Sequence, residues 1–301
     1  MKKGILALLL IAIFQVKAMA KVSLEADLQT FIDGKDARIG VAVISGTDTV
    51  SVNGHEPFPM MSVYKFPIAL AVADRCRATG LLFAERLHVT GKNLNPDTYS
   101  PMLKKYGDIG ADGAEISLRE LLKYALQESD NNASDILLDW AGGAEKVDCY
   151  ISGLGADGIS VKWSEDEMYE DHDRSYGNSS TPVAMASLMN LFIGMPEDSL
   201  TVELKQIMET CATGTARLVK PLVNSDAVVG HKTGTGFTLP DGRLMAINDA
   251  GYVILPDGIR YSIAVFIADS GYSAVETEAL IAGISEIVLK DMLSGNQSVN
   301  R

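Results

Sequence analysis

The chain reads RIGVAVI at residues 38–44, GTD at 46–48 and TVSV at 49–52. The first and last stretches are made of the apolar and β-branched residues typical of strands, and the short polar stretch between them is typical of a turn. We therefore predict an antiparallel hairpin near the N-terminus.

A second group of strands is expected near the C-terminus. Residues 251–255 and 259–268 are apolar runs separated by the turn sequence PDG at 256–258, and a closing helix is expected from 274 to 293. Because strand edges need partners, the strands from the two ends of the chain should pair with each other. The sequence thus predicts one sheet built from both termini.

The middle of the chain is predicted to be helical. The clearest helix follows the capping-box sequence SLRE at 117–120, after which apolar side chains recur at helical spacing. No repeat or long linker divides the chain, so a second domain must share an interface with the first. We expect an α/β sheet domain of residues 21–61 plus 215–301 and an all-helical domain of residues 62–214, with a small-molecule site in the cleft between them.

Residues 1–20 have the layout of a secretory signal peptide. Lys2 and Lys3 precede an apolar run at 5–14, and the small-residue sequence AMA ends at Ala20. The apolar run is shorter than the roughly 20 residues that a membrane-spanning helix needs. We expect cleavage after Ala20, secretion across the inner membrane into the periplasm, and no membrane association of the mature protein.

The composition indicates a globular protein with a substantial core. Hydrophobic residues make up 47% of the 301 residues, and the formal net charge is -13 at pH 7. Such a size and composition exclude a disordered or fibrous chain. The strong negative charge argues against nucleic acid and anionic membranes as partners.

Neither the cysteines nor the histidines suggest a metal site. Cys76, Cys149 and Cys211 are odd in number and form no C-x-x-C pair, so we expect buried free thiols rather than zinc ligands or a disulfide framework. The histidines also lack metal-ligand spacing; they are His55, His88, His172 and His231. We expect no metal and no cofactor, and we expect His231 to be a packed strand residue.

The sequence SVYK at 62–65 is the first candidate for chemistry. Ser62 is the only serine followed by a lysine three positions later, a spacing that places both side chains on one helix face. Residues 66–73 are nearly all apolar, so Lys65 should be partly desolvated. Burial favours neutral lysine, which could accept the Ser62 proton. The alternative is an ordinary helix start with a solvated lysine.

Two further polar motifs follow. In SDN at 129–131, Ser129 could pass a proton to a leaving nitrogen and Asn131 could bind a substrate amide, although the motif could also be a polar turn. In KTGTG at 232–236, the lysine and the hydroxyls offer a local positive patch for a carboxylate in an acidic protein. The alternative for this motif is an exposed edge strand.

The three motifs in this order match the S-x-x-K, S-D-N and K-T-G set. The sequence resembles class A serine β-lactamases from about Leu28 to Leu293, and within them the Bacteroides-type cephalosporinase branch. The resemblance implies an α+β fold: an antiparallel five-stranded sheet flanked by helices, formed from both termini, with an inserted all-helical domain. The β-lactamase and transpeptidase folds share this arrangement.

The resemblance also implies roles in acylation. Ser62 is the nucleophile that attacks the lactam carbonyl, Lys65 helps to activate it, and Ser129 protonates the leaving nitrogen. Backbone N–H groups of Ser62 and Thr235 hold the oxyanion. The expected substrate-binding residues are Lys232, Thr233 and Thr235 for the carboxylate, Asn131 for the side-chain amide, and Tyr99 at the rim.

Deacylation requires a general base, which the resemblance places at Glu165 in SEDEM at 164–168. Its carboxylate must be ionised and within one water of the ester. Glu167 remains open as an alternative alignment, although we expect the acidic residues other than Glu165 to form a solvated turn, namely Asp166, Glu167, Glu170 and Asp171. Most family members have asparagine four residues after the glutamate, whereas this chain has Tyr169, which puts the deacylation rate and substrate range in question.

The expected activity is hydrolysis of penicillins and cephalosporins, which confers antibiotic resistance, with a preference for cephalosporins implied by the branch alone. A β-lactam is the expected partner and the protein is expected to be a monomer. A cell-wall transpeptidase or carboxypeptidase shares the acylation chemistry, and Glu165 is the feature that discriminates. A serine-dependent glutaminase is disfavoured by the signal peptide, and a penicillin-binding sensor by the lack of membrane-spanning segments.

Overall fold

The structure is a computed structural model that describes residues 23–297. The predicted signal peptide, residues 1–20, lies outside the described residues. Among the helices of residues 23–297, none combines the length and apolarity needed to cross a membrane.

The centre of the molecule is a five-stranded antiparallel sheet with strand order β2-β1-β10-β9-β8. Its strands are β1 (Arg38–Ser45), β2 (Asp48–Val52), β8 (Val228–Thr235), β9 (Leu244–Ile254) and β10 (Arg260–Ser270). In β1, Arg38 lies opposite Ala268 of β10, so the two ends of the chain meet in one sheet, as predicted. The predicted α+β fold is confirmed.

Strand β9 is longer than predicted. It begins at Leu244 rather than at Gly251, because Asn248 and Asp249 interrupt the apolar pattern yet are fully buried. The Asn248 amide donates to the Pro59 and Met60 carbonyls, and Asp249 pairs with a buried histidine. Polar residues with such partners are compatible with a central strand.

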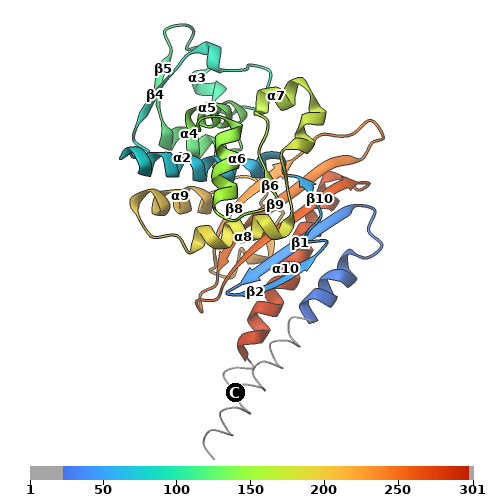
Figure 1. The fold of residues 1–301 in the computed structure, drawn as a ribbon. Coiled ribbons are helices and arrows are strands. Elements are labelled where there is room, and N and C mark those ends of the chain that lie inside the picture. Colours follow the sequence, from blue (N-terminus) through green and yellow to red (C-terminus); the bar gives the residue numbers. More distant parts are fainter. Residues whose placement is uncertain (1–22, 298–301) are drawn as a thin grey trace, which may run out of the picture.

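Each face of the sheet packs against its own set of helices (Figure 1). Val41 and Val43 face a hydrophobic core shared with the helical residues 23–32 and with α10 (Ala274–Gln297). Their neighbours Ala42 and Ile44 face the second core, which includes α8 (Pro182–Ile193). This alternation follows from the two-residue period of a strand. Burial on both faces makes the sheet the rigid base of the molecule.

The helices between β2 and β8 form the second part of the molecule (Figure 1). They are α2 (Lys65–Thr79), α3 (Leu103–Tyr106), α4 (Leu118–Gln127), α5 (Asn131–Ala141), α6 (Ala144–Gly153), α7 (Glu165–Glu170), α8 and α9 (Ser199–Glu209). Residues 66–73 of α2 are apolar all round the helix, and α2 contacts α4, α5, α6 and α9. A helix with such a surface must be surrounded. The domain boundaries at residues 62 and 215 stay a prediction.

This middle region also contains short strands and 3-10 turns, so it is mainly rather than wholly helical. The strands are β3 (Phe58–Pro59), β4 (Arg86–Val89), β5 (Ala114–Ser117), β6 (Ile159–Ser160) and β7 (Ser179–Ser180). The 3-10 turns are η1 (Met61–Tyr64), η2 (Gly91–Asn93), η3 (His172–Gly177) and η4 (Lys220–Leu222).

The predicted capping box at the start of α4 is only half formed. The Ser117 hydroxyl accepts from the Glu120 backbone N–H at 3.2 Å. The Glu120 carboxylate does not return to the cap but accepts from Lys105 and Tyr106. The contact with Lys105 and Tyr106 replaces the bond to the Ser117 N–H, because it gives one Glu120 carboxylate oxygen two donors.

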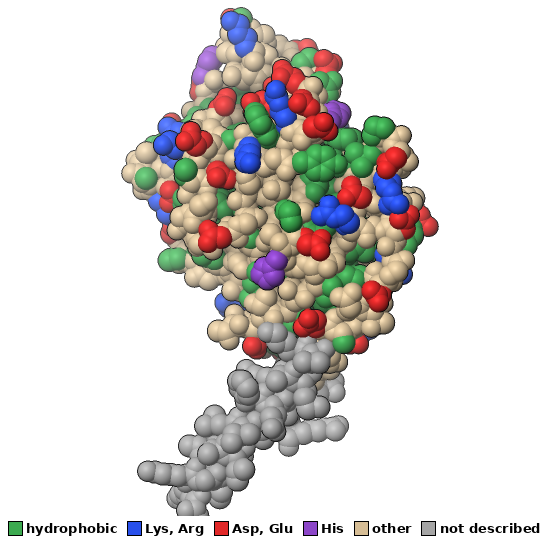
Figure 2. Space-filling view, turned by 45° about the vertical axis from the view of Figure 1, so that its right-hand side comes forward, with side chains coloured by type: hydrophobic (Ala, Val, Ile, Leu, Met, Phe, Trp, Pro, Cys, Tyr) green, Lys and Arg blue, Asp and Glu red, His purple; other side chains and the backbone are tan. Residues whose placement is uncertain are grey.

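The cysteines are free, but only Cys76 is buried. Cys211 is partly buried, and Cys149 is exposed, so the expectation of a buried thiol is wrong for Cys149, which lies on the outer face of the amphipathic helix α6. The face of the molecule in Figure 2 carries acidic and basic side chains interspersed with small apolar areas.

Candidate active site

A cleft of about 490 Å³ lies where η1, α5 and α7 meet the end of β8. Seven of the nine residues predicted for the site line it, namely Ser62, Tyr99, Ser129, Asn131, Glu165, Thr233 and Thr235. The other two, Lys65 and Lys232, are 1% and 0% exposed and lie in the wall behind these residues. The structure therefore brings all nine predicted residues together.

Ser62 lies in the 3-10 turn η1, one turn before the regular helix α2, rather than at the start of the α-helix itself. Met61, which precedes it, has a φ of 47°, a conformation that is strained for a side chain of this size. The Asn248 amide holds the Pro59 and Met60 carbonyls, and a Cβ at Gly234 would meet the Met60 oxygen at 2.4 Å. The turn that presents Ser62 is thus fixed against β8 and β9.

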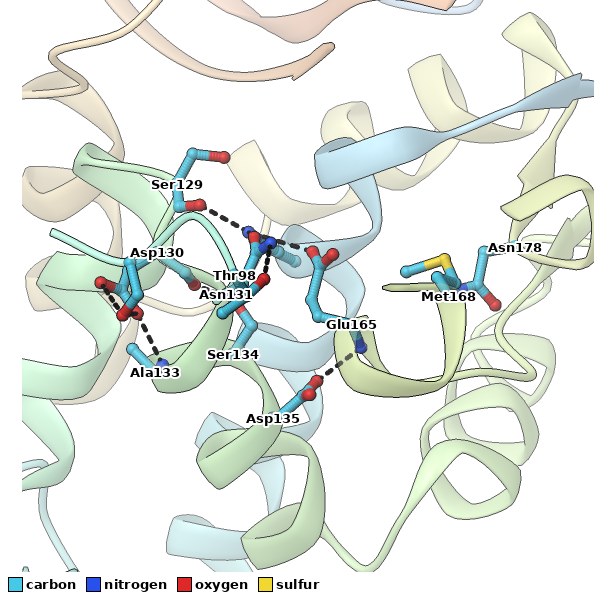
Figure 3. Close-up of polar contacts among 12 residues, drawn as sticks. Thr98, Ser129, Asp130, Asn131, Ala133, Ser134, Asp135, Glu165, Met168 and Asn178 are labelled. Carbon is cyan, nitrogen blue, oxygen red and sulfur yellow. Dashed lines mark hydrogen bonds and ion pairs between the residues drawn. The ribbon is translucent and has the colours of Figure 1, made fainter. Parts of the chain in front are cut away.

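The Lys65 ammonium group connects three parts of the site. It donates to the Ser129 carbonyl at 2.6 Å and to the Asn131 Oδ1 at 2.7 Å. Its Nζ also lies 3.1 Å from the Glu165 Oε1 (Figure 3). The lysine is desolvated, as predicted, but it is compensated by a carboxylate that the spacing of S-x-x-K could not indicate.

Ser129 lies between α4 and α5 with a φ of 61°. The buried Asp130 stabilises this turn, since its carboxylate accepts from the Ser100 hydroxyl and from the Met102 and Ala133 N–H groups. The Ser129 Oγ in turn accepts from the Lys232 Nζ at 2.9 Å. Ser129 therefore contacts both buried lysines through different atoms.

Strand β8 supplies the opposite wall of the cleft. Burial lowers the pKa of Lys232 to about 7, and its ammonium group also donates to the Thr233 carbonyl at 2.8 Å. The Thr235 hydroxyl accepts from the Arg217 Nη2 at 2.7 Å. The end of β8 thus presents hydroxyls backed by two cations, an arrangement suited to a carboxylate.

Glu165 begins helix α7, whose first turn is held by Asp135 of α5. The Asp135 carboxylate accepts from the Glu165 N–H at 2.7 Å (Figure 3) and from the Asp166 N–H at 2.9 Å. Burial, and next the charge of Glu165, raise the pKa of Asp135 to about 7. This carboxylate positions the backbone from which the Glu165 side chain reaches Lys65.

The acidic segment 165–170 is a helix rather than the predicted solvated turn. Ser164 caps it, and the Glu167 carboxylate returns to the Ser164 N–H at 2.9 Å in a complete capping box. The Glu167 carboxylate therefore caps the start of α7, whereas the Glu165 carboxylate points to Lys65 and lines the cleft.

The rim of the cleft is aromatic. Tyr99 is 61% exposed and Tyr169 is 49% exposed, and both line the opening. The Asn131 N–H donates to the Tyr99 carbonyl, and its amide group donates to the Thr98 hydroxyl at 2.8 Å. Asn131 is thus oriented on both sides, with Thr98 at one end of its amide and Lys65 at the other (Figure 3).

Known proteins similar to this chain agree with the geometry. The sequence model of the Beta-lactamase enzyme family matches residues 23–292. A beta-lactamase of Bacteroides uniformis is 38% identical over 92% of this chain and 94% of its own length. The crystal structure of a class A beta-lactamase from Bacteroides cellulosilyticus superimposes with a TM-score of 0.87 at 36% identity, covering 91% of this chain and 99% of that chain.

The chain belongs to the class A β-lactamase family. It is therefore a hydrolase of β-lactams. Similarity extends to the beta-lactamase VEB-1 of Pseudomonas aeruginosa, which is 33% identical over 88% of this chain and 89% of its own length. Matches of this extent favour a β-lactamase over the peptidase, glutaminase and sensor alternatives.

Several residues that orient the site of this β-lactamase escaped the sequence reasoning. Asp130 lies inside the SDN motif, and Asp135 lies four residues after Asn131 on the same face of α5, so helical spacing could have indicated it. Arg217 and Thr213, whose hydroxyl is hydrogen-bonded to that of Thr233 at 2.6 Å, carry no local signal. The Arg217 side chain is buried and also donates to the Gly234 and Asn248 carbonyls at 3.0 Å, which only the folded chain reveals.

Beneath β8 of the β-lactamase lies a buried polar cluster. His231 is packed in the strand, as predicted, and its Nδ1 lies 2.9 Å from the Asp249 Oδ1. Burial disfavours the charge of His231, but Asp249 overcomes this and raises its pKa to about 10. Burial also opposes a Cys211 thiolate, yet His231 and Lys232 lower the pKa of Cys211 to about 7. In residues 23–297, no group of three or more His, Cys, Asp or Glu could hold a metal ion.

Proposed function

We propose that this β-lactamase opens the lactam ring by forming an acyl-enzyme on Ser62. The Ser62 Oγ bonds to the lactam carbonyl carbon, and its proton passes to the Lys65–Glu165 pair, whose charged atoms are 3.1 Å apart. Backbone N–H groups of Ser62 and Thr235 would hold the oxyanion where its charge develops. The Ser62 hydroxyl makes no hydrogen bond to another described residue, so it is free to turn to substrate.

Ring opening then requires a proton on the leaving nitrogen. Ser129 is suited to supply it, because its Oγ accepts from Lys232 at 2.9 Å and its carbonyl accepts from Lys65 at 2.6 Å. When the C–N bond breaks, the Ser129 Oγ proton goes to nitrogen, and the proton that the Lys65–Glu165 pair took from Ser62 replaces it, so Lys232 stays charged. No additional proton carrier is needed.

Substrate recognition is assigned to both walls. The carboxylate of the antibiotic would lie against Thr233 and Thr235, backed by Lys232 and Arg217. Its side-chain amide would meet Asn131, with Tyr99 at the rim. The preference for cephalosporins is part of this proposal and rests on the branch resemblance alone.

Deacylation is assigned to Glu165. Its carboxylate takes a proton from water, the water oxygen bonds to the ester carbonyl carbon, and Ser62 leaves with a proton returned to it. Tyr169 is half exposed at the rim and offers no amide beside the base. This departure from most of the family should affect the rate of deacylation more than that of acylation.

The observation that carries this proposal is the contact of Glu165 with Lys65 in the wall that also presents Ser62 and Ser129. The test is hydrolysis of a chromogenic cephalosporin by the mature protein, with mass spectrometry of the same mixture. Ser62→Ala should form no adduct. Glu165→Gln should accumulate an adduct on Ser62, and rapid turnover by this variant would move the base elsewhere.

The same proposal covers the cellular role. The signal peptide, cleavage after Ala20, a periplasmic location, a monomeric state and resistance to β-lactams are its further parts. N-terminal sequencing of protein released by osmotic shock checks cleavage and location together. Light scattering of that sample checks the monomer.

A further inference from the structure

The polar motif at the start of α5 continues beyond SDN with a second asparagine, Asn132, which is 2% exposed. Its Oδ1 accepts from the Asn95 N–H at 2.7 Å, and its amide group donates to the Asn95 carbonyl at 3.0 Å. One buried side chain therefore holds both backbone polar groups of Asn95. Neither asparagine takes part in the proposed function, so this contact calls for another explanation.

Asn95 lies on the segment that orients the substrate-binding residue Asn131. The Thr98 hydroxyl accepts from the Asn131 amide at 2.8 Å, and the Tyr99 carbonyl accepts from the Asn131 N–H at 3.0 Å. The Asn95 Oδ1 accepts from the Asp97 N–H at 2.9 Å, which closes a local turn. The Asn95 side chain is thus fixed at its oxygen, and its amide N–H groups are left to bind another element.

The Asn95 amide reaches helix α7, which carries Glu165. Its Nδ2 donates to the Asp166 Oδ1 at 2.8 Å. Asp166 directly follows Glu165, whose Oε1 lies 3.1 Å from the Lys65 Nζ. Asp135 holds the same turn through other atoms, since it accepts from the backbone N–H groups of Glu165 and Asp166. The first turn of α7 is therefore held at two places, by Asp135 through the backbone and by Asn95 through a side chain.

We propose that Asn95 is a positioning residue for deacylation, which holds the first turn of α7 so that the Glu165 carboxylate stays beside Lys65. This inference rests on the proposed role of Glu165 as the general base. Helix α7 has only six residues, and so short a helix is not stable alone. The placement of Glu165 thus depends on contacts with other elements. Asn95 itself is not part of the cleft lining and neither gains nor loses a proton.

The bond between Asn95 and Asp166 can be broken by one substitution. Asn95→Asp keeps the oxygen that accepts from Asp97 but places a carboxylate against Asp166. We expect the adduct on Ser62 to decay about fivefold more slowly, the effect of one exposed hydrogen bond. Acylation should stay within about twofold, because Lys65 keeps its other contacts and can still accept the Ser62 proton. Mass spectrometry of the adduct after rapid mixing measures both rates.

The same bond can be restored in reverse. Asn95→Asp combined with Asp166→Asn exchanges the donor and the acceptor, so adduct decay should return to within about twofold of the parent rate. Asp166→Asn alone completes the double-mutant cycle. The control is Asn93→Asp, the same chemical change two residues earlier, where the side-chain oxygen accepts from the Thr90 N–H at 2.9 Å. This control should leave both rates unchanged.

Three results would overturn the inference. They are normal deacylation by Asn95→Asp, an equal loss of acylation in that variant, and a double variant that stays as slow as Asn95→Asp. The last result would assign the loss to a disturbance of the segment rather than to its bond with Asp166. Normal turnover by Glu165→Gln would instead overturn the proposed function, so the two failures are distinguishable.

Discussion

The two buried lysines of the cleft lie in walls of opposite character. In the helical wall, formed by Lys65, Ser129, Asn131 and Glu165, the ammonium group of Lys65 has a carboxylate at 3.1 Å. In the strand wall, formed by Lys232, Thr233 and Thr235, the ammonium group of Lys232 donates only to a hydroxyl and a carbonyl. One lysine carries its counter-ion within the protein, whereas the other lacks one.

This contrast in counter-ions suits the two walls to different steps of the reaction. A buried cation paired with a carboxylate can exchange a proton without a large change in local charge, which suits Lys65 to activation of Ser62. An unpaired buried cation is stabilised when an anion arrives, and burial lowers the pKa of Lys232 to about 7. The substrate carboxylate would thus complete the strand wall.

The largest expected effect tests the helical wall. Lys65→Met should lower the acylation rate about 10³-fold for every β-lactam, because it breaks the Lys65–Glu165 pair that accepts the Ser62 proton. Stopped-flow measurement of adduct formation checks this. Lys232→Met is the control, and it should act mainly through KM. Equal losses of acylation in the two variants would remove the distinction between the walls.

The second prediction concerns pH and the strand wall. Lys232 is charged below its pKa of about 7 and neutral above it, so carboxylate binding should weaken as pH rises. We expect kcat/KM for an anionic β-lactam to fall about tenfold between pH 6.5 and 8.5, since this ratio reports the free enzyme. Lys232→Arg keeps its charge over this range and should flatten the profile. A flat profile in the parent would show that Lys232 stays charged.

Whether the sequence predicts a residue of these walls depends on how far away along the chain its partners lie. Ser62, Lys65, Ser129 and Lys232 belong to short motifs, so local patterns were sufficient to find them. Strand pairing between the ends of the chain followed from unpaired edges. Arg217 could not be predicted, because its partner Thr235 is 18 residues away and no periodicity connects the two.

Buried polar residues explain the other failures. Asn248 and Asp249 resemble loop residues by type, yet they lie in the middle of β9 because distant backbone and side-chain groups satisfy them. The acidic segment after Ser164 resembles a solvated turn, yet Asp135 and a capping box make it the helix α7. In both places the deciding partner lies on another element.

A smaller effect is expected from Asp135, which supports the helical wall. Its pKa is raised from 3.8 to about 7 on folding, so its contribution to stability is greatest at low pH and is lost as pH rises through 7. Asp135→Asn cannot ionise, so the fall in Tm between pH 5.5 and pH 8 should shrink by about 4–8 °C, equivalent to about 2 kcal/mol. Asp139→Asn, an exposed change on the same helix, should leave that fall unaltered.

A still smaller effect is expected from Cys211, which lies beneath the strand wall. The nearest substitute for a counter-ion in the strand wall is the Cys211 thiolate. Burial raises the pKa of Cys211, but His231 and Lys232 lower it to about 7. The negative charge of this thiolate in turn raises the pKa of Lys232. Cys211→Ser removes this anion, so the pH at which kcat/KM begins to fall should drop by roughly 0.5 unit. Cys149→Ser, an exposed change on α6, is the control and should leave it in place.

The thiolate itself can be measured before any kinetics. Native Cys211 should react with iodoacetamide with a midpoint near pH 7, whereas burial raises the pKa of Cys76 to about 11 and should keep it unreactive. Cys211 could titrate near pH 7 while Cys211→Ser leaves the kcat/KM profile unchanged. That result would show that His231 compensates the charge of the Cys211 thiolate, so that the thiolate has no effect on the pKa of Lys232. In that case the strand wall would depend on the substrate alone for its counter-ion, and the contrast with the helical wall would be complete.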